Sequence, residues 1–304
     1  MKLISVIIPV YNEAENILPL HIELLKYCTD PVEFIFIDDG STDSTFDCIE
    51  KLAALDSRVS CLSFSRNFGH QNALMAGMEN ASGEIILMMD GDLQHPPSLI
   101  PEMIEKINQG FDLVNTKRKK TAEISFIKKI SGSFFYGFIN RISETTIEEN
   151  AADFKAFNRK VLESVLQFKE KDLFLRGIFS WIGFSATTLQ FDSPARKFGK
   201  TKYSFSKMLR LALKGTTSFS YKPLRIALFF GTIISMAAFG FGIFALAAYF
   251  KGDTIPGWAS LIIAMMILGG TQLLAIGLMG EYIASLFTEA KQRPRFLINK
   301  KINR

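Results

Sequence analysis

The sequence predicts an α/β protein with a doubly wound, mainly parallel sheet, followed by two membrane-spanning helices. Two observations predict the sheet: short apolar strands alternate with segments of helical length, and each of the first four strands ends in a polar cluster. A third observation predicts the anchor, because two long uncharged apolar runs lie near the carboxyl end of the 304-residue chain. The expected architecture is a catalytic sheet domain attached to a membrane.

The elements of the sheet domain follow from local patterns. Apolar, β-branched runs predict strands over residues 3–10, 32–37, 59–64, 85–89 and 112–116. Helices are expected over about 13–27, 44–55, 70–80 and 97–109.

The four polar clusters are YNE, DDGSTD, SRNFGH and DGDLQH, in chain order. Because the carboxyl ends of parallel strands meet at one edge of a sheet, these clusters predict a single active-site rim. This part of the chain has neither a G-x-G-x-x-G nor a G-x-x-x-x-G-K-[ST] motif, which disfavours an NAD enzyme or a P-loop ATPase.

The fourth cluster carries two aspartates at a spacing suited to a cation. Asp90 and Asp92 are two residues apart in an extended segment, so their side chains point the same way. The glycine between them lets a ligand approach the backbone, and Gln94 adds a carbonyl oxygen. Such oxygen ligands suit Mg²⁺ or Mn²⁺ held together with substrate phosphates. Taken alone, the pattern is equally consistent with two aspartates that cap the following helix.

The apolar runs Ile226–Phe250 and Trp258–Gly280 each exceed the roughly 20 residues that a membrane helix needs. Basic residues crowd both outer flanks, while the loop 251–257 carries one Lys and one Asp. The positive-inside rule therefore places the catalytic domain and both termini in the cytoplasm, with only this loop outside. The net charge of +5 indicates a membrane surface more readily than nucleic acid.

The amino-terminal apolar run is too short for a signal peptide and continues as a strand pattern. Residues 204–219 have an amphipathic pattern that favours a helix in the membrane interface, and residues 126–142 fit either an interfacial or an ordinary domain helix. The expected parts are the catalytic domain 1–203, a juxtamembrane helix 204–222, the membrane helices within 223–285 and a basic cytoplasmic tail 286–304.

The cysteines and histidines carry less information. The three cysteines lack C-x-x-C spacing, so we expect neither disulfides nor a zinc site. His95 adjoins the acidic motif and is a candidate substrate contact, whereas His21 and His70 are interpreted as surface or capping residues.

Seven sequence blocks together resemble the inverting GT-A glycosyltransferases that act on polyprenyl phosphates. The resemblance extends to the dolichyl-phosphate mannose synthases and, through the two carboxy-terminal spans, to the bacterial polyprenyl-phosphate glucosyltransferases. The blocks, which run from residue 5 to about residue 209, are VIIPVYNEAENI, FIDDGSTDST, FSRNFGHQNALMAGMENASGE, MDGDLQHPP, ADFKAFNRKV, FLRGIFSWIGF and RKFGKTKYSFSKML.

The resemblance implies a role for particular residues of this sequence. The base and ribose of a nucleotide sugar would contact Pro9, Tyr11, Glu13 and Asp39. Mg²⁺ or Mn²⁺ would be held against the diphosphate by Asp90, Asp92 and Gln94. Arg118 would contact the same diphosphate or the acceptor phosphate. It lies in the basic run 117–120, which taken alone fits a solvated loop equally well.

Asp153 is the other carboxylate expected near the reacting centre. A phosphate monoester has a second pKa of about 6 and is mostly ionised at neutral pH, so it needs little help from a base. Asp153 is therefore interpreted as organising the sugar or acceptor pocket, with a purely structural role as the alternative. The resemblance makes Arg196, Lys200 and Lys202 acceptor-phosphate ligands, and their position also suits lipid headgroups.

The sequence thus predicts a metal-dependent enzyme of the bacterial inner membrane that transfers a sugar to polyprenyl phosphate with inversion. UDP-glucose is the first donor to test, and GDP-mannose, UDP-N-acetylglucosamine and an aminoarabinose donor stay open, as does the length of an undecaprenyl-type acceptor. A processive polysaccharide synthase is disfavoured because the chain lacks a Q-x-x-R-W motif and further spans. A non-catalytic scaffold is the rival from another class. A slender two-helix anchor is compatible with a homo-oligomer, although nothing in the sequence counts subunits.

Overall fold

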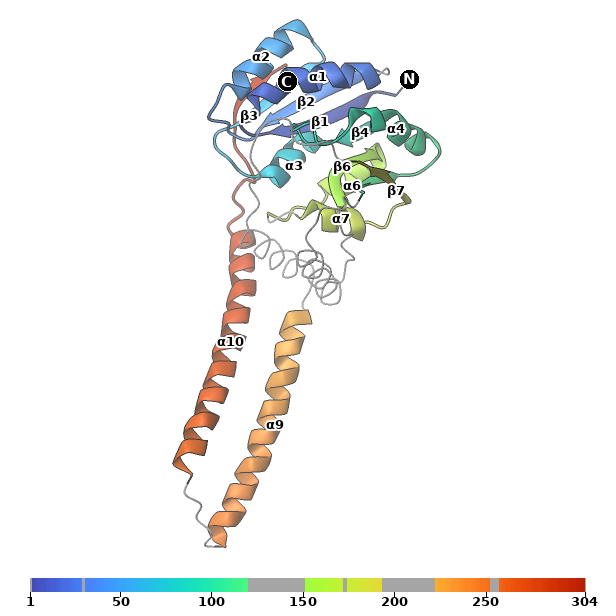
Figure 1. The fold of residues 1–304 in the computed structure, drawn as a ribbon. Coiled ribbons are helices and arrows are strands. Elements are labelled where there is room, and N and C mark those ends of the chain that lie inside the picture. The colour runs from blue at the N-terminus through green and yellow to red at the C-terminus, as the bar shows by residue number, and fades with distance from the viewer. Residues whose placement is uncertain are drawn as a thin grey trace.

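A computed structural model gives the structure of the protein. It describes residues 2–28, 31–119, 151–171, 174–192, 222–251 and 257–303. Figure 1 shows a sheet domain from which two long helices extend.

The domain is built on one eight-stranded sheet with the strand order β7-β5-β6-β4-β1-β2-β3-β8. Strand β1 pairs in parallel with β2 and β4, β2 with β3, and β5 with β7, while β6 and β8 run antiparallel to their neighbours. The predicted fold class, a mainly parallel α/β sheet of the GT-A type, is confirmed. The strands are β1 (Ile4–Val10), β2 (Val32–Asp38), β3 (Val59–Phe64), β4 (Ile85–Met88), β5 (Leu113–Arg118), β6 (Ala151–Asn158), β7 (Ala186–Phe191) and β8 (Ile298–Ile302).

Helices cover both faces of the sheet (Figure 1). One face packs against α1 (Ala14–Tyr27), α2 (Thr45–Leu55) and α4 (Ile100–Asn108), which follows the 3-10 turn η1 (Pro97–Leu99). The other face packs against α3 (His70–Asn80), α6 (Arg159–Leu166) and α7 (Leu175–Trp181).

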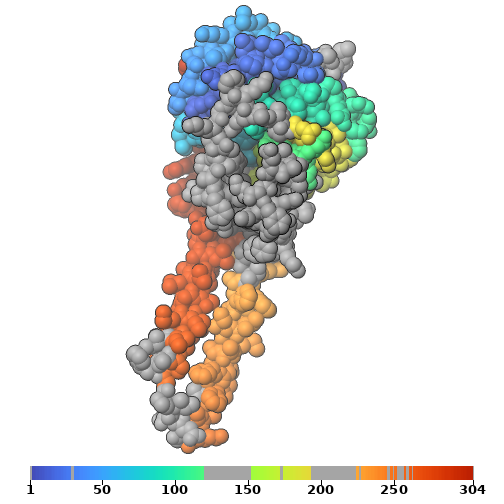
Figure 2. Space-filling view, viewed as in Figure 1, coloured from blue at the N-terminus to red at the C-terminus, as the bar shows by residue number. Residues whose placement is uncertain are grey.

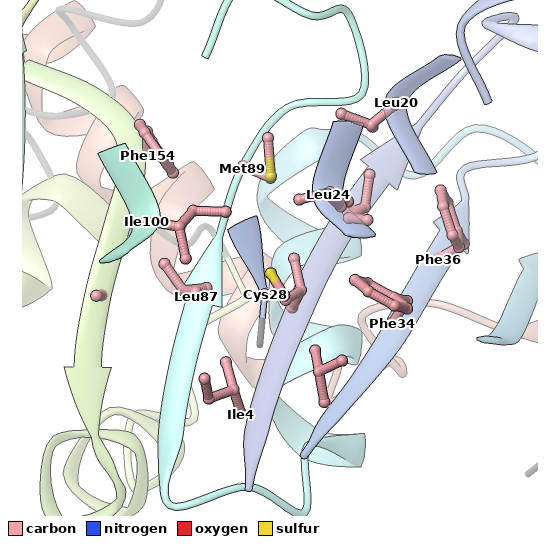
Figure 3. Packing of buried hydrophobic residues seen from close by; sticks show 14 of the residues in the cluster. Ile4, Leu20, Leu24, Cys28, Phe34, Phe36, Leu87, Met89, Ile100 and Phe154 are labelled. Carbon is pink, nitrogen blue, oxygen red and sulfur yellow. The ribbon is translucent and has the colours of Figure 1, made fainter. Parts of the chain in front are cut away.

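The central strands are apolar along their whole length because both of their faces are buried. In β1, Val6 and Ile8 join one cluster, while Ile7 between them joins the cluster on the opposite face. Figure 3 shows the first cluster, in which Leu20 and Leu24 of α1 lie over the sheet. This two-sided packing holds the carboxyl ends of β1, β2, β3 and β4 at one edge.

The helices α9 (Lys222–Phe250) and α10 (Trp258–Ala290) extend side by side away from the sheet domain (Figures 1 and 2). Their segments Ala227–Phe244 and Ile263–Ala290 are long and apolar enough to cross a membrane, and these segments are not buried within the protein. Large side chains such as Phe239 and Leu274 are exposed, as a helix facing lipid requires.

The segment after α10 corrects the predicted domain division. Residues 286–304 are predicted to form a tail separate from the catalytic domain, but α10 continues to Ala290 and β8 then joins the sheet as an edge strand beside β3. Phe296 stacks on Phe64 with ring centroids 4.8 Å apart, and the Arg295 side chain donates to the carbonyl oxygens of Phe168 and Glu170. The carboxyl end of the chain is therefore part of the domain.

Several predictions lie outside the described residues. They are the interfacial helix within 204–222, the helix within 126–142, most of the loop 251–257, and Arg196, Lys200 and Lys202.

Candidate active site

The polar clusters at the ends of the first three strands are joined to one another by hydrogen bonds. Asn12, which follows β1 in a left-handed conformation with φ 54°, donates its amide to Ser41 Oγ at 2.9 Å, and its side chain accepts the Thr42 amide at 2.9 Å. Asp39, after β2, accepts the amides of Phe68 and Gly69, after β3, at 2.7 and 3.0 Å. These contacts join the ends of three strands into one rim.

The two aspartates at the end of β2, Asp38 within the strand and Asp39 just after it, are buried, and both carboxylates accept hydrogen bonds from the protein. Asp38 accepts from the Ser41 amide at 2.9 Å and from Ser63 Oγ at 2.7 Å. Burial raises the pKa of Asp39, although the amides of Phe68 and Gly69 act in the opposite direction. The Asp39 carboxylate thus holds the loop after β3, and its predicted contact with a nucleotide stays a prediction.

The segment after β4 turns sharply at the aspartate pair. Leu93 has φ 60°, and a Cβ added at Gly91 would lie 2.6 Å from Val10 Cγ1, so the strand ends pack tightly at this point. Asp92 is buried and accepts the Gln94 amide at 3.1 Å. Asp90, Asp92 and Gln94 all lie in this turn, and their role as cation ligands stays a prediction.

His95 is buried behind this turn and contacts its backbone. Its Nδ1 accepts the Asp90 amide at 3.0 Å, and its ring stacks on Phe154 at a centroid distance of 5.1 Å. Burial lowers the pKa of His95, with Asp90 acting against that shift and Arg118 adding to it. Because His95 is fully buried, the expectation that it touches substrate is wrong, and its contacts instead fix the backbone of Asp90.

Asp153, in β6, lies close to the acidic motif. Arg176 of α7 donates from Nε to Oδ1 at 2.8 Å and from its terminal nitrogen to Oδ2 at 3.0 Å. Burial opposes ionisation of Asp153, but hydrogen bonds and charge from His70 and Arg176 outweigh it and lower the pKa of Asp153 well below the usual range. Asp153 is therefore a fixed, ionised carboxylate.

His70, the first residue of α3, is the functional candidate that the sequence analysis missed. Its Nε2 lies 3.4 Å from Asp90 Oδ1 and 3.7 Å from Asp153 Oδ2. Partial desolvation opposes its charge, although 40% of the side chain is exposed, and Asp153 and Asp90 together raise the pKa of His70 to about 9. His70 is exposed at the start of α3, in agreement with its interpretation as a surface residue, but its ring also lies between two carboxylates, which that interpretation did not include. Its place in the SRNFGH cluster was the available signal, as was that of Arg176 in the FLRG block.

The other predicted residues occupy the same edge of the sheet. Pro9 is buried in β1, Tyr11 and Glu13 follow it half-buried, and the Glu13 amide donates to Thr45 Oγ1 at 2.9 Å. Arg118 is the last residue of β5 and acts on the pKa of His95, which places its charge near Asp90.

The residues of the acidic turn fit a divalent cation. Asp90 Oδ1 is buried and accepts no hydrogen bond within the described part of the chain, so a bound cation would satisfy it. Carboxylate and amide oxygens are the ligands that Mg²⁺ and Mn²⁺ prefer. No cluster of three or more His, Cys, Asp or Glu side chains suited to a metal occurs among the described residues. Mg²⁺ commonly needs only one or two carboxylates beside substrate phosphates.

Comparison with known proteins identifies the family. Residues 5–166 match the model described as glycosyl transferase family 2. A protein described as a prophage bactoprenol glucosyl transferase homolog from Escherichia coli (strain K12) is 38% identical over 302 residues, covering 98% of each chain. The uncharacterized glycosyltransferase YkcC of Bacillus subtilis (strain 168) is also 38% identical, over 97% of this chain and 93% of that protein.

Among solved structures, the mannosyltransferase PcManGT from Pyrobaculum calidifontis, in complex with GDP-Man and Mn²⁺, covers 96% of this chain and 87% of its own. Its sequence identity is 17% and the TM-score is 0.47. The family match and the full-length relatives agree with each other, and the chain belongs to glycosyl transferase family 2.

Proposed function

We propose that this glycosyltransferase transfers a sugar from a nucleotide donor to polyprenyl phosphate at the cytoplasmic face of the bacterial inner membrane. The observation that carries the proposal is the buried, hydrogen-bond-free oxygen of Asp90 at the sheet edge. Two further findings support it: the two apolar helices in the same chain, and relatives of nearly equal length named bactoprenol glucosyl transferases.

The donor lies along the rim in this proposal. Its base and ribose contact Pro9, Tyr11, Glu13 and Asp39, and its diphosphate contacts Arg118. A divalent cation is held by Asp90, Asp92 and Gln94. When bound, Mg²⁺ or Mn²⁺ supplies Lewis-acid stabilisation of the charge on the departing nucleoside diphosphate.

The acceptor phosphate attacks the anomeric carbon in a single displacement, which inverts the configuration. A phosphate monoester is mostly a dianion at neutral pH, so its oxygen needs little deprotonation. Both Asp153 oxygens accept from Arg176, an arrangement that supports a role in shaping the pocket over a role as base. Arg196, Lys200 and Lys202 hold the acceptor phosphate.

The membrane arrangement follows from charge. Helices α9 and α10 cross the inner membrane, both termini and the sheet domain are cytoplasmic, and the short loop between the helices is outside. The return of β8 to the sheet supports this topology, because it joins the end of α10 to the same domain that precedes α9.

The test is sugar transfer by the detergent-purified chain with Mg²⁺ or Mn²⁺ and undecaprenyl phosphate. Radiolabelled UDP-glucose, UDP-N-acetylglucosamine and GDP-mannose are supplied separately. We expect label in the lipid from one donor, its loss on addition of a chelator, and its recovery with excess metal.

Asp92→Ala should abolish transfer, whereas Asp47→Ala, which removes an exposed carboxylate of α2, should leave it unchanged. Transfer that survives both the chelator and Asp92→Ala would overturn the metal assignment. Absence of both transfer and nucleotide binding would favour the scaffold instead.

A further inference from the structure

The unexplained feature of the site is a histidine between two carboxylates. His70 Nε2 lies 3.4 Å from Asp90 Oδ1 and 3.7 Å from Asp153 Oδ2. These residues come from the start of α3, the end of β4 and the strand β6, so only the tertiary fold brings them together. At these distances a protonated ring attracts both carboxylates as an ion pair rather than through a hydrogen bond.

Asp153 is held in place by a residue of a fourth element, the helix α7. The side chain of Arg176, in α7, makes the two-point contact with both Asp153 oxygens, and Asp153 is only 12% exposed. A planar guanidinium that contacts both oxygens fixes the orientation of the carboxylate as well as its position. The series Arg176, Asp153, His70 and Asp90 thus runs from α7 to the acidic turn.

Asp90 needs such support on this side. His95 fixes the Asp90 backbone, with its Nδ1 accepting the amide, but Asp90 Oδ1 accepts no hydrogen bond from the described residues. His70 is the side chain that the structure brings within ion-pair distance of that oxygen. The other oxygen, Oδ2, lies 3.6 Å from His95 Nε2, so the two histidines contact opposite oxygens of the Asp90 carboxylate.

The same protein contains a histidine, aspartate and arginine in a similar arrangement that lacks the second carboxylate. Arg58 donates to both oxygens of Asp56 at 2.9 and 2.8 Å, and His21 Nε2 lies 3.1 Å from Asp56 Oδ2. His21 packs edge-on against Phe34, and Asp56 is its one acidic partner among the described residues. This second triad joins α1 to the end of α2 and provides an internal control.

We propose that Arg176, Asp153 and His70 form a positioning relay that holds the Asp90 carboxylate in its cation-binding orientation. The relay rests on the proposed function, since it presumes that Asp90 binds a divalent cation with the donor diphosphate. His70 is a positioning residue, and Arg176 acts on Asp90 only through Asp153 and His70. Removing a residue that orients a metal ligand typically costs about 10- to 100-fold in metal affinity or activity.

The experiment measures Mn²⁺ binding rather than turnover. The detergent-purified full chain is titrated with Mn²⁺ in the presence of UDP and, separately, GDP, and free Mn²⁺ is followed by electron paramagnetic resonance. The tighter nucleotide is then used for His70→Gln, Arg176→Gln, Arg176→Lys and the double variant His70→Gln/Arg176→Gln. His21→Gln and Arg58→Gln are the matched controls, and the thermal midpoint of every variant is recorded.

We expect His70→Gln and Arg176→Gln each to weaken Mn²⁺ binding about 10- to 100-fold, with the double variant no worse than the weaker single one. Arg176→Lys keeps the charge but loses the two-point contact, so it should show an intermediate loss. His21→Gln and Arg58→Gln should lower the thermal midpoint while leaving Mn²⁺ affinity within about twofold of the original.

The outcomes separate the two proposals. If the original chain binds no Mn²⁺ with either nucleotide, the metal-dependent function itself fails. If it binds Mn²⁺ and the relay variants bind equally well, the relay is overturned while the function stands. The relay would also be overturned if the losses of Mn²⁺ affinity in the two single variants multiplied in the double variant. It would equally be overturned if His21→Gln and Arg58→Gln weakened Mn²⁺ binding as much as the relay variants do. Should His70→Gln fail to fold, the comparison of Arg176→Lys with Arg176→Gln decides.

Discussion

Two acidic turns flank the same strand, and the structure uses them differently. Asp38, Asp39 and Gly40 follow β2, while Asp90, Gly91 and Asp92 follow β4, and both strands pair with β1. In the first turn the carboxylates accept backbone amides and a serine hydroxyl, whereas in the second Asp90 Oδ1 accepts nothing from the described residues.

The difference shows that an acidic cluster at a strand end does not by itself define a ligand site. What decides is whether neighbouring loops supply donors. The loop after β3 turns its amides toward Asp39, and Ser63 reaches Asp38, so the first turn stabilises the fold. The second turn keeps an oxygen for a ligand. Four substitutions test this contrast.

The largest expected effect is that of Asp90→Asn on catalysis. Transfer should fall roughly 100- to 1,000-fold, since the substitution removes a charge aimed at the cation and diphosphate. The thermal midpoint should change little, because Oδ1 loses no hydrogen bond and the ion pair with the exposed His70 contributes little to stability. Radiolabel transfer and thermal unfolding of the same preparation measure both effects. A large loss of stability with activity retained would contradict the assignment.

Gly40→Ala should damage the fold rather than the chemistry. Gly40 has φ 70°, and an added Cβ would lie 2.4 Å from the backbone carbon of Arg66. A left-handed alanine costs roughly 1–2 kcal/mol, and the clash with backbone should bring the loss to about 3 kcal/mol. Gly91→Ala is the matched variant, since its Cβ would meet the tip of the Val10 side chain. Equal thermal midpoints for the two variants would argue against the contrast.

Asp38→Ala should lower stability by about 2 kcal/mol, because it leaves the Ser41 amide and the Ser63 hydroxyl without their acceptor. Transfer per folded molecule should change little. Urea unfolding followed by tryptophan fluorescence gives the stability, and kcat at saturating donor gives the activity. The double variant Asp38→Ala/Ser63→Ala should be less destabilised than the sum of the single changes.

The smallest effect is expected for Asp43→Ala. Asp43 accepts the Thr45 amide at 3.0 Å where α2 begins, and loss of such a cap costs about 1 kcal/mol. Its kinetic constants should match those of the original chain. A loss of donor affinity, measured as a raised KM, would show that Asp43 contacts the nucleotide in addition to Asp39.

The sequence by itself determined the sheet class, the first five strands and the apolar helices α9 and α10. Those features depend on local periodicity and length, because a strand buried on both faces and a helix in lipid each impose a pattern on their own residues. The prediction that Asp90 and Asp92 face the same way assumed an extended chain, but β4 ends at Met88 and both aspartates lie beyond it.

The tertiary structure decided the rest. Strand β8 carries Lys300 and Lys301, a composition typical of a solvated tail and equally of a protected sheet edge, and only pairing with β3 distinguishes the two. His70, Asp153 and Arg176 lie far apart in the chain, so no spacing relates them. Whether a carboxylate is engaged or left for a ligand depends on donors from other loops, because a hydrogen bond is set by distance in space and not by separation along the sequence.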